Sequence, residues 1–297
     1  MPEGLIVKAL SGYYYVKPDA VDTEIVQCRG RGIFKKRGQS PLVGDRVIYS
    51  PTENGEGMVD ELLTRTTELI RPPVANATIA VLLFSVREPD MSYLLLDKFL
   101  VHIEHAGLKP IICLTKGDLL AKVGDELIQR TVELYERVGY QVLVTSSAEG
   151  QGVEAVREQL SGSISVFAGQ SGVGKSSLLN AMLPGIELET SEISLRLGRG
   201  RHTTRHVELL DLGHGAYVAD TPGFSQLDFL ELGVGELSPC FIEFIPYAEK
   251  CKFRGCSHLH EPGCMVKEAL EQGAIAASRY EHYVAFYQEM KDKKRRY

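Results

Sequence analysis

Gly169-Gln170-Ser171-Gly172-Val173-Gly174-Lys175-Ser176 is the stretch that decides the fold of the middle of the chain. It has the pattern G-x-x-x-x-G-K-[ST], in which a glycine-rich turn lets backbone N–H groups surround phosphate oxygens. An apolar run precedes it at 164–168 and a helix-forming run follows it at 177–182, as a strand–loop–helix unit requires. We therefore predict a phosphate-binding loop that continues to Ser177. Within it, Lys175 supplies positive charge to the terminal phosphates, and Ser176 offers a hydroxyl to Mg²⁺.

A second pair of motifs is expected to read the nucleotide base. Thr115-Lys116-Gly117-Asp118 ends a predicted strand, and the Asp118 carboxylate can accept hydrogen bonds from guanine N1 and N2, a pair of donors that adenine lacks. Ser146-Ser147-Ala148 follows the next predicted strand, where a backbone N–H would meet the guanine O6. Each motif alone is also compatible with a solvated loop. Their spacing of one β/α unit favours GTP and GDP as the ligands.

Two segments downstream of the phosphate loop are expected to sense the γ-phosphate. Asp220-Thr221-Pro222-Gly223 follows a strand-like run, which places the Asp220 carboxylate near Mg²⁺ and the Gly223 N–H near the γ-phosphate. A glycine-rich stretch, 198–206, lies between this motif and the phosphate loop. One of its threonines, Thr203 or Thr204, is expected to ligate Mg²⁺, with Thr204 as the working assignment. The alternative for this stretch is an ordinary mobile basic loop.

The group that positions the attacking water is not evident from the sequence. Phe224 follows Gly223, at a position where many regulatory GTPases have a glutamine that orients water. A phenyl ring cannot do this, so we expect slow intrinsic hydrolysis. The candidate catalytic residues are Lys175, Thr204, His202 and His206, although either histidine is also compatible with an exposed loop position or an RNA contact.

These motifs stand in an unusual order along the chain. Predicted strands and helices alternate between residues 79 and 168, which indicates an α/β domain with a parallel sheet covered by helices on both faces. The base-reading motifs come before the phosphate loop instead of after it. Such a circular permutation is tolerated because the termini of a domain usually lie close together. Since the chain leaves the domain soon after Gly223, we expect the segment that follows to be coupled to the nucleotide state.

The N-terminal segment has a different pattern. Five short β-rich runs between Leu5 and Leu63 predict a small barrel, and Arg71-Pro72-Pro73 predicts an extended boundary because consecutive prolines exclude helix. The segment from Arg29 to Arg46 contains six basic residues and a single acid, Asp45. This basic group is a candidate RNA-binding surface, and the alternative is a solvated strand face or loop. Its six cations are Arg29, Arg31, Lys35, Lys36, Arg37 and Arg46.

The C-terminal segment contains a cluster of metal-ligand residues. Cys251, Cys256, His258 and Cys264 offer three thiolates and one imidazole, a closed tetrahedral donor set for a structural Zn²⁺. His260 is an alternative to His258. A helical run over 278–292 follows, so we predict a mainly helical domain that binds one Zn²⁺ per chain.

Composition limits the classes of protein that remain. The chain has 297 residues, 44% hydrophobic and 24% charged, with a net charge of −6, which is ordinary for a globular protein and argues against coating nucleic acid through overall charge. The longest apolar run, Ile79–Phe84, is far shorter than the ~20 residues of a membrane helix. The start Met1-Pro2-Glu3-Gly4 lacks a signal-peptide pattern, and we expect a cytoplasmic protein.

The barrel-like start, the permuted order, the string 198–206 and the Cys/His segment together resemble the bacterial ribosome small-subunit-dependent GTPase family. The resemblance implies an OB-fold at 1–70, a circularly permuted GTPase domain at 71–230 and a zinc-binding domain at 231–297. It implies the 30S ribosomal subunit and its 16S rRNA as partners, late 30S assembly as the process, and ribosome-stimulated GTP hydrolysis. We expect a monomer without membrane contact. The alternatives are an RNA-binding clamp with negligible turnover and a P-loop ATPase or kinase.

Overall fold

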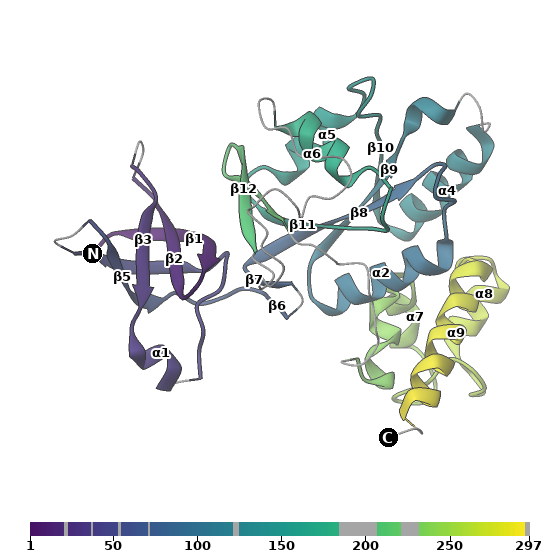
Figure 1. Ribbon diagram of the computed structural model, residues 1–297. Coiled ribbons are helices and arrows are strands. Elements are labelled where there is room, and N and C mark those ends of the chain that lie inside the picture. Colours follow the sequence, from purple (N-terminus) through teal and green to yellow (C-terminus); the bar gives the residue numbers. More distant parts are fainter. Residues whose placement is uncertain are drawn as a thin grey trace.

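A computed structural model gives three parts arranged in a row: a barrel, a central sheet with helices on both faces, and a C-terminal group of helices (Figure 1). The description that follows covers residues 1–20, 23–36, 38–52, 55–70, 72–120, 125–183, 207–220 and 232–294.

The N-terminal part is a five-stranded barrel. Its elements are β1 (Glu3–Leu10), β2 (Tyr13–Pro18), β3 (Val26–Gly30), α1 (Gly32–Lys36), β4 (Arg46–Pro51) and β5 (Gly57–Leu62). The strands pair in the order β1-β2-β3-β5-β4, and β4 also pairs with β1, which closes the barrel. Alternate residues point inward, so that Ile6, Val16 and Val59 are fully buried. The predicted barrel is confirmed, and its closed five-stranded form is that of an OB-fold.

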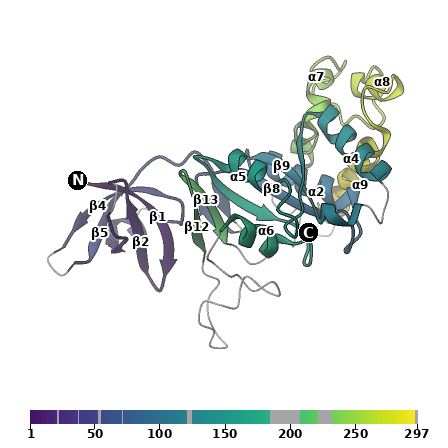
Figure 2. The same ribbon diagram turned by 90° about the horizontal axis from the view of Figure 1, so that it is seen from above.

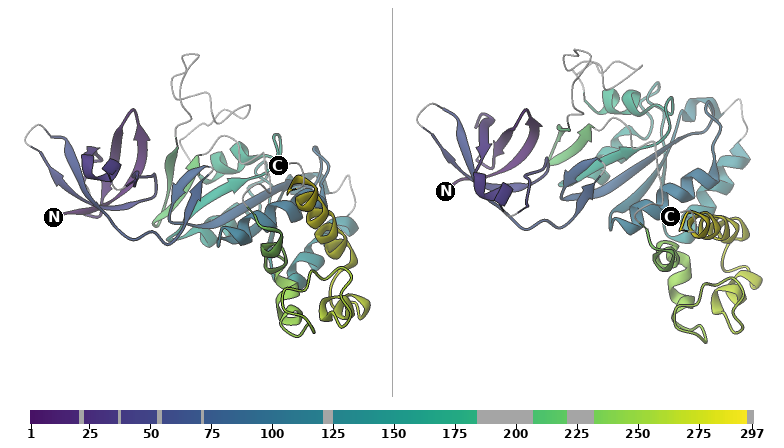
Figure 3. Two further views of the ribbon diagram at one scale, coloured as in Figure 1. Left: turned by 90° about the horizontal axis from the view of Figure 1, so that it is seen from below. Right: turned by 60° about the horizontal axis from the view of Figure 1, so that its bottom comes forward.

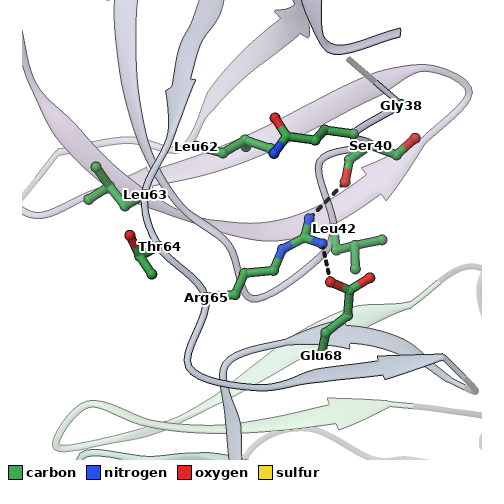
Figure 4. Close-up of a pocket in the computed structure, with 9 residues that line it drawn as sticks. Gly38, Ser40, Leu42, Leu62, Leu63, Thr64, Arg65 and Glu68 are labelled. Carbon is green, nitrogen blue, oxygen red and sulfur yellow. Dashed lines mark hydrogen bonds and ion pairs between the residues drawn. The ribbon is translucent and has the colours of Figure 1, made fainter.

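A small hairpin, β6 (Glu68–Ile70) and β7 (Pro73–Ala75), connects the barrel to the next part. It is packed rather than extended into solvent, because Val74 is fully buried and forms a bridge with Val43 of the barrel. Arg65 lies beside it and donates two hydrogen bonds to the buried Asp45 carboxylate, at 2.7 and 2.8 Å. Arg65 lines a cavity of about 590 Å³. Figure 4 shows its further partners there, the backbone oxygen of Ser40 and the carboxylate of Glu68.

The central part is built on a mainly parallel sheet. Its strands are β8 (Ala77–Ser85), β9 (Lys109–Thr115), β10 (Gln141–Val144), β11 (Ile164–Ala168), β12 (Glu208–Gly213) and β13 (Ala216–Asp220). The order is β10-β9-β8-β11-β13-β12, in which β12 is antiparallel to β13 and the other pairs are parallel. The strand β8 is apolar and buried on both faces, as a central parallel strand requires.

Helices cover both faces of this sheet, as predicted (Figure 1). They are α2 (Tyr93–His105), α4 (Asp125–Val138), α5 (Val153–Leu160) and α6 (Lys175–Met182). Leu96 and Phe99 of α2 and Tyr135 of α4 belong to the apolar cluster on one face. Val156 of α5 and Leu178 of α6 belong to the cluster on the other face. The short helix η1 (Gly117–Leu119) follows β9.

The C-terminal part packs against α2. Its elements are η2 (Val234–Glu236), η3 (Ser238–Cys240), η4 (Ile242–Phe244), α7 (Ile245–Ala248), α8 (Met265–Glu271) and α9 (Ala277–Lys294). Figure 3 shows α9 beside the α2 side of the sheet. The predicted helix at 278–292 is confirmed, whereas the shorter helices before it have no long apolar repeat that predicts them. None of the helices in the described ranges is long and apolar enough to cross a membrane.

Candidate nucleotide-binding site and metal centre

The phosphate loop lies between the end of β11 and the start of α6, as its sequence predicts. Gly169 has a φ of +152°, and a Cβ at this position would lie 2.3 Å from the backbone oxygen of Leu83. A larger residue would therefore push the loop away from β8. Gly174 has a φ of +92°, in the left-handed region that glycine enters without strain. It comes directly before α6, whose first N–H groups favour an anion.

The predicted phosphate-binding side chains stand at the start of α6. Lys175 Nζ donates hydrogen bonds to the backbone oxygens of Gly169, at 2.7 Å, and Gln170, at 2.8 Å. Partial burial lowers the pKa of Lys175 from its usual value, because burial penalises the charged form. Ser176 and Ser177 are half-buried in the first turn, while Ser171 and Gly172 are exposed at the loop surface.

The motif predicted to read the base is hydrogen-bonded directly to the phosphate loop. The Thr115 hydroxyl donates to the backbone oxygen of Val173 at 2.5 Å, so the end of β9 and the phosphate loop form one unit. Lys116 has a φ of +60°, and its Nζ donates to the backbone oxygen of Glu88 in the loop after β8. The side chains of Thr115 and Lys116 therefore connect three neighbouring loops at the carboxyl end of the sheet, where α/β folds bind ligands.

The second segment predicted to read the base contacts the first. The Ser146 hydroxyl donates to Asp118 Oδ1 at 2.8 Å, and Gly117 N donates to the backbone oxygen of Thr145 at 2.8 Å. Ser147 and Ala148 continue the same loop after β10. The structure thus brings together the phosphate loop, Thr115-Lys116-Gly117-Asp118 and Ser146-Ser147-Ala148. The contact from Ser146 to Asp118 was not predicted, because only a backbone N–H of this segment was expected to have a role.

Several predicted site residues lie outside the described ranges: Thr203, Thr204, His202, His206, Gly223 and Phe224. The backbone of Asp220 is described as the last residue of β13, where it lies opposite Glu208 of β12. The assignments of these residues to the γ-phosphate, Mg²⁺ or water therefore stay predictions.

The Cys/His residues of the C-terminal part converge on one point. One donor atom from each of Cys251, Cys256, His258 and Cys264 lies within 4.8 Å of the others. His258 Nδ1 is 3.4 Å from Cys264 Sγ and 3.7 Å from Cys251 Sγ. Three thiols and one imidazole with this spacing match a structural Zn²⁺ site. His258 is only 2% exposed, and burial lowers its pKa, which favours the neutral ring that a metal needs. His260 is exposed and is not part of the group.

Glu261 supports this cluster and was missed by the sequence analysis. Its carboxylate accepts hydrogen bonds from Ser257 N at 2.8 Å, Ser257 Oγ at 2.6 Å, and the backbone N–H groups of Leu259 and His260 at 3.2 Å. Burial raises the pKa of Glu261, but these bonds outweigh it and lower the pKa to about 2. The only available signal was an acid placed between two ligand residues.

Part of the basic group on the barrel is engaged in ion pairs. Arg46 pairs with Asp19, and Arg31 with Asp60 at 2.6 Å. Arg29 lies over the ring of Tyr13, 4.8 Å from its centre. Lys36 is exposed, while Arg37 and the side chain of Lys35 are outside the described residues. Arg29 also lies 4.0 Å from the Glu56 carboxylate, so acids outside the segment pair with three of its arginines. The interpretation of this group as an RNA-binding surface stays a prediction.

A phosphate loop joined to an upstream guanine-type motif defines a P-loop GTPase with circularly permuted order. The chain belongs to the RsgA GTPase family: the family model described as RsgA GTPase matches residues 62–230, and the RsgA N-terminal domain matches residues 3–59. The predicted family, the multidomain fold and the enzyme class, GTPase, are confirmed.

Full-length relatives and solved structures agree with this assignment. The chain is 51% identical over 297 residues to the small ribosomal subunit biogenesis GTPase RsgA of Shouchella clausii, covering 100% of each. It is 53% identical over 298 residues to the protein of the same name from Bacillus velezensis, again covering 100% of each. The crystal structure of YloQ, a circularly permuted GTPase, has 46% identity and a TM-score of 0.85, covering 99% of this chain and 96% of that one. YjeQ from Thermotoga maritima has 38% identity and a TM-score of 0.86, with 97% and 98% covered.

Proposed function

We propose that this protein hydrolyses GTP to GDP and phosphate while bound to the small, 30S ribosomal subunit, and that it acts in the late assembly of that subunit. The observation that carries the proposal is identity of 51 to 53% over the whole chain to proteins named small ribosomal subunit biogenesis GTPase. The three joined loops at the carboxyl end of the sheet support GTP as the nucleotide, because a hydrogen bond from Ser146 holds Asp118, the proposed guanine reader, beside the loop after β10.

Each part of the site has a proposed role. Lys175 and the loop from Gly169 to Gly174 hold the phosphates, and Lys175 also stabilises charge during hydrolysis. Ser176 and Thr204 ligate Mg²⁺, which would neutralise charge between the phosphates, and Asp220 supports that ion. Thr203 and the Gly223 N–H respond to the γ-phosphate. Because Phe224 cannot orient water, His202, His206 or a group supplied by the ribosome performs that step.

The flanking parts are proposed to hold the partner. The barrel, 1–70, and the metal-binding part, 231–297, would contact 16S rRNA on either side of the GTPase domain, 71–230. Exposed cations such as Lys36 support backbone contacts to RNA. We infer a monomer that works in the cytoplasm, where small subunits are assembled, and that carries one structural Zn²⁺. Metal analysis of protein purified without chelator is expected to give one equivalent of zinc, and its absence would refute that assignment.

The deciding experiment is steady-state GTP hydrolysis in one buffer with no addition, with purified 30S subunits and with 50S subunits. We expect strong stimulation by 30S subunits alone. The Lys175→Ala variant serves as the control for contaminating activity and is expected to be inactive in all three reactions. Turnover that is negligible even with 30S subunits would favour the clamp alternative, which Phe224 supports, and competition by ATP would favour the ATPase or kinase alternative.

A further inference from the structure

The barrel and the GTPase sheet meet along one strand edge. The β1 strand pairs antiparallel with β12 through Lys8 and Glu208, so that the two parts share one eleven-stranded sheet. Figure 2 shows the β12–β13 hairpin beside β1 and β2. We call this contact the seam and define it by Lys8 and Lys17 of the barrel and by Glu208, Asp211 and Tyr217 of the hairpin.

Glu208 lies opposite two residues at once. On one side it is in register with Lys8 of the barrel, and on the other side with Asp220 at the end of β13. Asp220 is the residue assigned above to Mg²⁺ support, and Thr204 precedes Glu208 by four positions in the chain. The hairpin therefore runs from one predicted γ-phosphate-sensing segment to the other, and its outer edge faces the barrel.

Side chains reinforce the seam at two points. Lys8 Nζ is 2.8 Å from Glu208 Oε2, and Lys17 Nζ is 2.5 Å from Asp211 Oδ2. Lys17 Nζ also lies 5.3 Å from the centre of the Tyr217 ring. Hydrogen bonds to Asp211 and Tyr217 raise the pKa of Lys17, so the lysine stays charged at neutral pH.

The contacts across the seam are weak enough to break and re-form while both parts stay folded. Both ion pairs are partly exposed, and exposed pairs contribute little to stability and weaken in salt. Among the described residues, one pair, Lys8 and Glu208, connects the strands β1 and β12 in register. A small displacement of the hairpin would therefore break the seam without unfolding either the barrel or the sheet.

We propose that the seam couples the nucleotide state of the GTPase domain to the position of the barrel. The inference rests on the proposed function for its biological use, since the barrel is there a ribosome-contacting part. Coupling is reciprocal. A partner that holds the barrel in the GTP-state position must also favour the GTP-state arrangement of the hairpin, and so of the residues at both of its ends.

Hydrogen exchange of the full-length, zinc-loaded protein tests the seam without ribosomes. Amide exchange over Glu3–Leu10 is measured with GDP and with a non-hydrolysable GTP analogue. In wild type the two nucleotides should give different exchange rates in β1.

The variant Lys8→Glu/Lys17→Asp, which reverses both lysine charges, should lose that difference. The variant Lys8→Glu/Lys17→Asp/Glu208→Lys/Asp211→Lys, which swaps the charges across the seam, should regain it. Lys109→Glu, at the start of β9 on the far side of the sheet, is the matched control and should behave as wild type.

A second measurement relates the seam to the partner. We expect 30S-stimulated GTP turnover to fall about tenfold in Lys8→Glu/Lys17→Asp, within the usual range of coupling between sites, while turnover without 30S subunits stays at the wild-type rate. A wild-type exchange difference in β1 that persists in this variant, or is absent from wild type, would overturn the inference. Absence of 30S stimulation in wild type would count against the proposed function, and the exchange result would still decide the seam.

Discussion

The Thr115 hydroxyl donates a hydrogen bond of 2.5 Å to the backbone oxygen of Val173, 58 residues further along the chain. This bond connects the end of β9, which Lys116 and Asp118 directly follow, to the middle of the phosphate loop. Thr115 is itself buried, and its Oγ1 also lies 3.3 Å from the backbone oxygen of Phe84. The predicted base-reading segment and the phosphate loop are thus held next to each other by contacts within the protein itself.

Removal of that hydroxyl should weaken nucleotide binding. Thr115→Val keeps the branched shape of the side chain but leaves the Val173 carbonyl without this partner. We expect a loss of about 1 kcal/mol, or roughly fivefold in the Kd for GDP, measured by titration of a fluorescent GDP analogue. Thr115→Ser retains the hydroxyl and should bind as wild type. Equal affinity in Thr115→Val would show that the bond does not hold the two halves of the site together.

A change at Asp118 should alter the choice of base. Asp118→Asn replaces the carboxylate that is proposed to accept from the guanine N–H donors with an amide, and we expect GTP affinity to fall by roughly 10- to 100-fold. Xanthine offers a carbonyl in place of the amino group, so affinity for xanthosine triphosphate should rise. Ser146→Ala is the comparison, because it removes the hydrogen bond to Asp118 without changing the acceptor. Ser146→Ala should lower the affinity for GTP modestly and leave the preference for guanine unchanged. An unaltered base preference in Asp118→Asn would exclude Asp118 from base reading.

The phosphate loop and the parallel strands could be predicted because local chemistry determines them. Glycines at positive φ and an apolar run such as Ile79–Phe84 leave few alternatives. The strand β12 was not predicted, since its sequence, Glu208-Leu209-Leu210-Asp211, does not alternate and its partners, β13 and β1, are set by tertiary structure. The role of Glu261 was missed for a similar reason, because its four donors meet only in the folded loop.

A buried charge network should hold the C-terminal part on the GTPase domain. Arg279 and Asp97 are each about 1% exposed as side chains and lie 2.6 Å apart, and Arg279 also pairs with Glu243 at 2.7 Å. Asp97 also accepts a hydrogen bond from Tyr135 at 2.8 Å. Asp97→Asn should lower the free energy of unfolding by about 3–5 kcal/mol, because it leaves buried Arg279 with one of its two charge partners missing.

A neighbouring pair supplies the control for this effect. Lys98 pairs with Glu289 across the same α2–α9 contact at 3.0 Å but is partly exposed. Lys98→Gln should therefore lower the free energy of unfolding by about 1 kcal/mol or less. Urea denaturation followed by circular dichroism compares the two variants. Similar costs for both would mean that burial does not distinguish these two ion pairs.

The zinc affinity of the Cys/His site should depend on Glu261, although this residue is not one of the four expected ligands. With its pKa lowered to about 2, Glu261 is ionised at neutral pH and accepts bonds from both sides of the ligand loop. In Glu261→Gln one carboxylate oxygen is replaced by an NH₂ group. That group cannot accept hydrogen bonds, so either the Ser257 donors or the N–H groups of Leu259 and His260 lose their acceptor. We expect zinc affinity to fall by roughly 10- to 100-fold, as for other groups that orient metal ligands.

Competition with a chromophoric zinc chelator measures this change in the full-length protein. Glu268→Gln is the matched control, because Glu268 is an exposed acid on α8 whose carboxylate bonds only to the side chain of Gln272 among the described residues. It should retain wild-type zinc affinity. If Glu261→Gln also retains it, the ligand geometry is set by the backbone of residues 256–264 and by the hydroxyls of Tyr280 and Tyr283, which bond to the carbonyls of His258 and Ser257. In that case the loss of zinc affinity should appear instead when both tyrosines are replaced by phenylalanine.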